Sequence, residues 1–356
     1  MTRLALVMIA RDEAHRIARA LDSARPHVDL MIVLDTGSLD ATAEIARACG
    51  AQVHHFAWVD DFAAARNASL DLSPADWNLV LDADEWIEAG AECLAGPLPH
   101  DAMGWVRRDN RLDQSGADTL AQTWIPRLLP RGVRYEGRIH EQPVGLEKGV
   151  RLPLTLGHDG FTAENLARKG DRNEILLMAE LRDQPEDPYL WFQLAKELQV
   201  RGRPPQAALC FTESLRLAPA DVPWRHSLVV RAVTALKEAG QLDEALELVR
   251  AETPAWAVSP DFHFAAGDLY LECATAAPDR AVGEFLPLAE AAWKTCLEIG
   301  EQPHLDGAVR GRGGHMAAHN LATLYETFGP PEAAARYHAL ARDLRAAPSA
   351  ALPQGS

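Results

Sequence analysis

Two carboxylates separated by one small residue follow a short apolar run in the first quarter of the chain. Residues 79–81 read L-V-L and lead directly into Asp82 and Asp84. Such a run is typical of a buried parallel strand whose carboxyl end opens into a site. Alternate side chains of an extended segment share a face, so both carboxylates can point to one spot. Because Mg²⁺ and Mn²⁺ are often held by one or two carboxylates together with substrate phosphates, we expect a metal–diphosphate site here. An acidic pair at a strand end can also be a solvated loop.

The composition is that of an ordinary globular protein with an excess of acid. The 356 residues are 47% hydrophobic and 24% charged, with a net charge of −16. This charge argues against nucleic acid or an anionic membrane as the main partner. No run reaches the roughly 18 apolar residues of a membrane span, and the N-terminus reads as a strand rather than a signal peptide. Five scattered cysteines without C-x-x-C spacing indicate a reducing compartment, so we expect a cytoplasmic protein.

Apolar strand-like runs alternate with amphipathic helical segments in the first part of the chain. The expected strands cover residues 4–9, 30–34, 52–56 and 79–81. This alternation with short connections predicts a parallel sheet with right-handed crossovers, whose function sits at the carboxyl ends of the strands. Further along, residues 105–109 and 119–129 read as strands that flank a polar loop over 111–117.

Four ordered strings carry a family resemblance. V-M-I-A-R-D-E, I-V-L-D-T-G-S-L-D, W-V-D-D-F-A-A-A-R-N and L-V-L-D-A-D-E-W resemble the family 2 glycosyltransferases over about residues 1–160. The resemblance implies the GT-A fold, an α/β domain with a Rossmann-like, mostly parallel sheet. Relatives often have Lys-Asn-Glu where this chain has Arg-Asp-Glu at 11–13, and G-S-T-D where it has G-S-L-D. These departures concern the base or sugar preference rather than the fold.

The resemblance also implies roles for individual side chains. The residues expected to face the nucleotide are Arg11, Asp12, Asp35, Arg66, Asn67 and Asp82. Asp82 and Asp84 are expected to ligate a Mn²⁺ or Mg²⁺ ion. Asp35 can instead be only a turn former or helix cap, and Arg66 a solvent-exposed helix residue. Asp60 and Asp61 are more simply read as a cap for the helix that follows them.

A later string, G-R-I-H-E at residues 137–141, is similar to one that lies near the metal in relatives. His140 is the candidate third metal ligand, although it can also be a packed histidine. Arg138 can neutralise the phosphate charge that develops as the sugar–phosphate bond breaks. Glu141 and Asp109 are candidate general bases, and either can equally be surface charge. His158 is a further candidate ligand.

The remainder of the chain reads as helical and repetitive. The positions that match the tetratricopeptide (TPR) template are Trp191, Leu194, Ala195, Leu198, Gly202, Ala207, Phe211, Ser214 and Pro219. A second copy aligns Gly240 with Gly202. We therefore expect a GT-A domain over 1–161, an all-α TPR-like domain of stacked helix pairs over 162–347, and a disordered tail over 348–356. The helical domain is expected to present a polypeptide acceptor or to form a homodimer.

Taken with the resemblance, these features predict a metal-dependent, inverting glycosyltransferase. It would move a sugar from a nucleotide-diphosphate sugar, by resemblance a uridine diphosphate (UDP) sugar, to a peptide, protein or glycan acceptor. The alternative is a TPR scaffold whose transferase domain has lost activity; the intact Asp35, Asp82, Asp84 and His140 argue against it. A nucleotidyltransferase would need a Gly-rich basic loop after the first strand, and residues 8–13 lack one.

Overall fold

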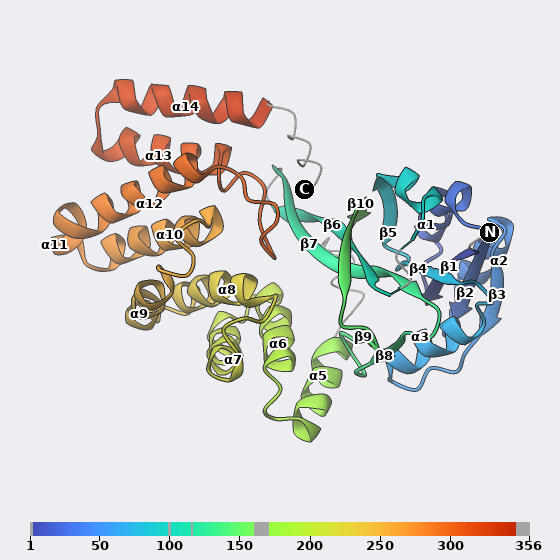
Figure 1. Cartoon of the computed structure of the whole chain (residues 1–356). Helices are drawn as coiled ribbons and strands as arrows, with labels where there is room; N and C mark the ends of the chain where they lie inside the picture. The colour runs from blue at the N-terminus through green and yellow to red at the C-terminus, as the bar shows by residue number, and fades with distance from the viewer. Residues whose placement is uncertain (1–2, 99–100, 115–116, 160–170, 347–356) are drawn as a thin grey trace. The chain divides into compact units, whose positions relative to one another are not determined.

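The computed structural model describes residues 3–98, 101–114, 117–159 and 171–346. The chain forms two compact units, Met1–Pro185 and Glu186–Ser356. The first is an α/β unit and the second consists of helices (Figure 1), which confirms the predicted order of fold classes. The predicted boundary at residue 161 and the tail over 348–356 lie outside the described residues.

An eight-stranded sheet forms the centre of the first unit, in the order β3-β2-β1-β4-β7-β6-β10-β5. The strands are β1 Leu4–Ala10, β2 Leu30–Asp35, β3 Gln52–His55, β4 Trp77–Val80, β5 Glu85–Ala89, β6 Met103–Gln114, β7 Ala117–Pro130 and β10 Gly149–His158. The first four strands are mutually parallel, as the sequence predicts. β10 runs parallel to β6, whereas β7 is antiparallel to both of its neighbours. A separate two-stranded sheet pairs β8 Arg134–Glu136 with β9 Gln142–Val144.

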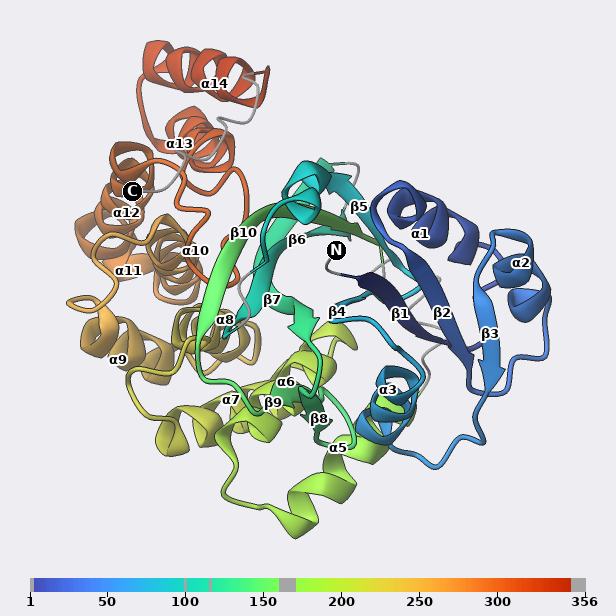
Figure 2. The ribbon, with the colours of Figure 1, turned by 45° about the vertical axis from the view of Figure 1, so that its right-hand side comes forward.

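Helices cover both faces of this sheet (Figure 2). Ile17 and Leu21 of the first helix are fully buried against Leu6 and Leu79, while Leu70 of the third packs with Val7 on the opposite face. The Asp61 side chain accepts a hydrogen bond from the Ala64 amide at 2.8 Å, so the predicted helix cap is confirmed. The three helices are α1 Ile17–Ala24, α2 Thr42–Ala48 and α3 Phe62–Asp71.

The expected polar loop over 111–117 is wrong for most of its length. Strands β6 and β7 continue as a hairpin, with Arg111 opposite Leu120 and Gln114 opposite Ala117. Sequence reading misses such a hairpin because a strand segment without an alternating apolar face has no period-2 signal.

The second unit is built from antiparallel helix pairs. α6 packs on α7, α8 on α9, α10 on α12 and α13 on α14. Gly202 and Gly240 occupy the predicted turns with φ values of 66° and 74°, a conformation that favours glycine. Phe211, Phe262 and Trp293 are buried between the helices.

The helices are α6 Pro188–Val200, α7 Pro204–Leu217, α8 Arg225–Glu238, α9 Leu242–Glu252, α10 Pro260–Ala276, α11 Pro278–Arg280, α12 Leu286–Ile299, α13 His315–Phe328 and α14 Pro331–Ala346; α5 Arg172–Asp183 belongs to the first unit. Among the described residues, no helix combines the length and hydropathy needed to cross a bilayer.

Candidate active site

The loops that follow β1, β2, β4 and β10 are joined by polar contacts at one edge of the sheet. Asp12 accepts a hydrogen bond from the Leu39 amide at 2.7 Å, and the Asp159 amide donates to the Asp84 carbonyl at 3.3 Å. Three non-glycine residues of the described chain have a positive φ: Asp12, Asp60 and His140, at 56°, 56° and 51°. They lie in the loops after β1, β3 and β8. Backbone of this kind is uncommon and clusters at functional sites.

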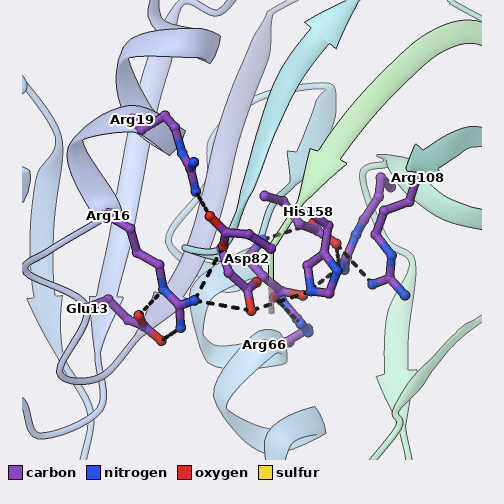
Figure 3. A network of polar contacts seen from close by, with 11 residues as sticks. Glu13, Arg16, Arg19, Arg66, Asp82, Arg108 and His158 are labelled. Atoms are coloured by element: carbon purple, nitrogen blue, oxygen red, sulfur yellow. Dashed lines mark hydrogen bonds and ion pairs between the residues drawn. The ribbon is translucent and has the colours of Figure 1, made fainter. Parts of the chain in front are cut away.

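Asp82 is held by two arginines. Its Oδ1 accepts from Arg66 at 2.6 Å and its Oδ2 accepts from Arg127 at 2.5 Å (Figure 3). Both guanidinium groups are more than nine-tenths buried, while the Asp82 side chain is 30% exposed. Arg66 also forms an ion pair with Glu141. The first carboxylate of the D-x-D triplet is therefore a junction between α3, β7 and the loop of residues 137–141.

A buried carboxylate at the start of β5 extends this network to β6. Glu85 is fully buried; its Oε1 accepts from Arg127 at 2.7 Å and from Arg108 at 3.2 Å. Its Oε2 accepts from the Asp82 amide at 3.2 Å. Acids and bases thus alternate along one chain of contacts: Glu141, Arg66, Asp82, Arg127, Glu85 and Arg108. We call these six residues the ion chain.

A β-bulge aims Arg127 into the ion chain. Gly104 of β6 pairs with Leu128 of β7, whereas the next residue, Trp105, pairs with Pro126. Arg127 is the extra residue between them. Bulges re-aim side chains and are frequent beside active sites, and Pro126, which lacks an amide hydrogen, suits such a break in the ladder.

The arginines determine the charge state of Asp82. Burial raises the pKa of Asp82, but the positive charges of Arg127 and Arg66 outweigh this effect and bring the pKa well below its usual value. Burial lowers the pKa of Arg127, and the charges of Asp82 and Glu85 more than reverse that change. Asp82 and Arg127 therefore both stay ionised at neutral pH.

Asp84 faces a different set of partners. Its Oδ2 lies 3.5 Å from Nε2 of His158, at the end of β10, and 3.9 Å from Nη1 of Arg16, the residue that precedes α1. Arg16 is nearly buried, is bound by Glu13, and lies 3.6 Å from Asp159. In Figure 3, Arg16 lies at the left beside Glu13, apart from Arg66, which lies below Asp82. The two carboxylates of the triplet thus have separate environments.

This arrangement can hold a divalent cation at Asp84. A carboxylate oxygen and an imidazole nitrogen at 3.5 Å fit Mn²⁺ or Mg²⁺, which take further ligands from substrate phosphates and water. Asp82 fits less well, since both its oxygens are bound by guanidinium groups. Among the described residues, no three His, Cys, Asp or Glu side chains are grouped as a ready-made metal site. The predicted set Asp82, Asp84 and His140 is not such a group, and its assignment stays a prediction.

The residues expected at the nucleotide base line two cross-linked loops. Asp35 is buried; it accepts from the Ser38 amide at 3.0 Å and lies 3.1 Å from Nδ1 of His55. The Asp12 amide donates to the Ser38 hydroxyl at 3.0 Å. The Arg11 and Asp12 side chains are about half exposed. These contacts fix the loop backbone and leave Arg11 and Asp12 open to solvent.

Three other predicted site residues have their polar contacts elsewhere. The side-chain amide of Asn67 donates to the Tyr135 carbonyl and accepts from its amide, at 2.9 and 2.8 Å, so Asn67 anchors β8 to α3. Arg138 lies 3.6 Å from Glu180 of α5. Asp109 pairs with Arg107 at 2.9 Å, on the face of β6 opposite to Arg108. Their predicted roles in nucleotide binding and catalysis have no support from these contacts.

Sequence reading missed the arginines that complete the site. Arg16 and Arg108 have no motif of their own, and Arg127 lies inside an expected strand. A charged residue directly after a proline in an apolar strand was the one available signal for Arg127.

Known proteins resemble this chain over its N-terminal part and beyond. Residues 5–95 match the family model described as Glycosyl transferase family 2. Over 265 residues the chain is 31% identical to a TPR repeat-containing protein of Synechococcus elongatus, covering 70% of this chain and 66% of that protein. Over 274 residues it is 24% identical to the SPbeta prophage-derived glycosyltransferase SunS of Bacillus subtilis, covering 69% and 62%. The chain thus spans just under two thirds of the length of these relatives.

Two solved structures are similar to parts of the chain. The crystal structure of MamA is 16% identical, covers 52% of this chain and 95% of that one, and has a TM-score of 0.39. The glucosyl-3-phosphoglycerate synthase of Mycobacterium tuberculosis, solved with Mn²⁺, UDP and glucosyl-3-phosphoglycerate, is 26% identical over 31% of this chain and 44% of that one, with a TM-score of 0.27. TM-scores this low do not define a shared site.

Proposed function

Because residues 5–95 match the model of glycosyl transferase family 2, we propose that the chain transfers a sugar from a nucleoside-diphosphate sugar to an acceptor hydroxyl, thiol or amine. The observation that carries the proposal is that the two acids of the D-x-D triplet have different partners. Asp82 is bound by Arg66 and Arg127, and Asp84 lies beside His158. A UDP sugar is the donor that the family resemblance implies.

The residues at the carboxyl edge have complementary tasks in this proposal. The cross-linked loops with Asp12 and Asp35 receive the base and ribose, as the resemblance implies. Arg66 and Arg127 present fixed, buried positive charge beside Asp82. Since Glu141, Asp82 and Glu85 balance these charges, the two arginines would serve to hold Asp82 ionised and in one orientation beside Asp84. Asp84 and His158 would hold a Mn²⁺ or Mg²⁺ ion, which when bound adds positive charge at the diphosphate.

Inverting transfer requires a base that removes the acceptor proton. Glu141 is the better placed of the two candidate carboxylates, because it shares Arg66 with Asp82, whereas Asp109 pairs with Arg107 on the other face of β6. We therefore assign the base role to Glu141. Arg66 would orient this carboxylate toward the donor.

The helical second unit would present the acceptor, for which a peptide or protein is our first choice. Stacked helix pairs form extended surfaces that commonly bind polypeptides. A homodimer formed through the same unit is the other predicted role. Light scattering on the purified chain would test the dimer directly.

Nucleotide-dependent thermal stabilisation tests the donor site. A ligand that binds only the native state raises its stability by RT ln(1 + [L]/Kd). We expect a UDP-dependent rise in Tm that is larger with Mn²⁺ than with a chelator, and that loses its metal dependence in Asp84→Asn. Asp343→Asn, at an exposed carboxylate of α14, is the matched control.

The outcome also separates the enzyme from the alternative scaffold. If no nucleotide in a panel of uridine, guanosine, thymidine and cytidine diphosphates stabilises the folded chain, the transferase proposal fails. A scaffold that has lost its activity would then account for the helical unit.

A further inference from the structure

We infer that the helical second unit carries a seat for a carboxylate of an acidic peptide, centred on Arg231 of α8. This seat does not depend on the proposed sugar transfer, because all of its residues lie between α6 and α13. Arg231 carries a positive charge that no described acid of this chain pairs with.

Arg231 forms no ion pair within 4 Å with any described carboxylate. Its one hydrogen bond in the described chain runs from Nη1 to Oε1 of Gln199, a neutral amide, at 2.8 Å. Some other arginines of the unit do have close acidic partners: Arg225 lies 2.5 Å from Glu252, and Arg201 lies 2.8 Å from Glu197. The chain has a net charge of −16, yet no described carboxylate pairs with this partly buried arginine.

The surroundings of Arg231 increase the cost of leaving it without a counter-ion. Its side chain is partly buried, and burial lowers its pKa, as does the nearby guanidinium of Arg312. The carboxylate of Asp306 acts in the opposite direction, but the two lowering effects together are larger. A charge that is partly desolvated beside a like charge is stabilised by an anion that reaches it.

Arg312 completes the seat from the connection between α12 and α13. Its Nη1 donates to Oδ1 of Asp261 at 3.1 Å, so Arg312 is already neutralised. Its Nε is buried and has no hydrogen-bond partner in the described chain. Asp261 is almost fully buried and also accepts from the Val309 amide at 2.8 Å, which holds this connection against α10. Asp261 thereby holds Arg312 in place next to Arg231. Of these two arginines, Arg231 is the one without an acidic partner.

The position of the seat favours a polypeptide. The Arg231–Gln199 bond joins α8 to α6, which are the first helices of two successive pairs (Figure 1). Arg231 therefore lies on the side of the unit that is formed by the first helix of each pair, here α6 and α8. In stacked helix arrays such a side forms an extended binding surface. A guanidinium fork suits the planar carboxylate of a glutamate or aspartate side chain or of a chain terminus.

Binding of a fluorescent oligoglutamate peptide to the full chain tests the inference. At low ionic strength we expect anisotropy to report binding that oligoglutamine does not show. Arg231→Gln should weaken it about tenfold, as removal of a charged partner commonly does, and Arg231→Lys should retain part of it. Arg280→Gln removes the same charge at an exposed arginine that pairs with Glu284, and should leave binding within about twofold.

Gln199→Glu provides a second, independent test. It places a carboxylate opposite Arg231 inside the chain, so Tm should rise while binding of oligoglutamate falls. A purely structural role of the Arg231–Gln199 contact predicts the same rise in Tm with unchanged binding. The inference is overturned if the wild-type chain binds oligoglutamate no better than oligoglutamine, if Gln199→Glu leaves binding unchanged, or if Arg280→Gln weakens binding as much as Arg231→Gln. None of these results depends on sugar transfer.

Discussion

Nη2 of Arg127 lies 2.5 Å from Oδ2 of Asp82 and 2.7 Å from Oε1 of Glu85, so one nitrogen joins two carboxylates. The arginine reaches them because it is the extra residue of a bulge in β7. This contact connects the end of β4 to a strand that follows it by about forty residues in the sequence. Because guanidinium groups bind both of its oxygens, Asp82 is less suited than Asp84 to ligate a metal, and its predicted role as a ligand stays a prediction.

Replacing Arg127 should destabilise the fold. Arg127→Gln leaves Asp82 and Glu85 with one fewer compensating charge in a buried setting, and breaking such pairs costs about 3 kcal/mol or more. Urea denaturation followed by circular dichroism would measure this loss in the free energy of unfolding. Arg134→Gln is the control, since its ion pair with Asp71 is exposed and is expected to contribute less than about 1 kcal/mol. Equal, small losses in the two variants would contradict a stabilising ion chain.

The two acids of the triplet should respond differently to substitution. Asp84→Asn is expected to abolish the Mn²⁺-dependent part of the stabilisation by UDP with little change in Tm of the ligand-free chain. Asp82→Asn is expected to lower Tm of the ligand-free chain, because Arg66 and Arg127 lose their shared carboxylate. Thermal unfolding with UDP, with and without Mn²⁺, measures both effects. Loss of the Mn²⁺ response in Asp82→Asn alone would reverse our assignment of the metal to Asp84 and His158.

Asp82 also predicts a pH dependence of stability. Its pKa in the folded chain lies below that of an unfolded aspartate, about 3.9. The carboxylate therefore stabilises the fold above about pH 4, and this contribution is lost as pH falls below that value. The difference in unfolding free energy between the wild type and Asp82→Asn should be constant from pH 5 to about 7 and shrink below about pH 4. A difference that stays constant down to about pH 3 would show that Arg66 and Arg127 do not act through the charge of Asp82.

The strands and terminal acids of the site could be predicted from the sequence, whereas the arginines that bind these acids could not. Strands β1, β2 and β4 were readable because each is a short apolar run that ends in polar residues, so Asp35, Asp82 and Asp84 could be assigned to one edge of a parallel sheet. The partners of these acids could not be read in the same way. Arg16 directly precedes a helix and Arg127 lies in a distant antiparallel strand, and their contacts depend on packing and on one bulge. A motif with local spacing, such as G-R-I-H-E, identified the correct loop but not that its Glu141 pairs with Arg66, which binds Asp82.

Arg16 should compete with a metal ion for Asp84. Its Nη1 lies 3.9 Å from Oδ2 of Asp84, and two unit charges about 4 Å apart interact by about 4 kcal/mol at an effective dielectric constant of 20. We expect about a third of this energy to appear as tighter binding of the cation when the charge of Arg16 is removed. Arg16→Met should then lower the Mn²⁺ concentration for half-maximal UDP-dependent stabilisation by about tenfold. Arg19→Met is the matched control, because Arg19 pairs with Asp159 and stacks on Trp86. An increase in the required Mn²⁺ concentration in Arg16→Met would mean that Arg16 positions Asp84 for the metal instead of competing with it.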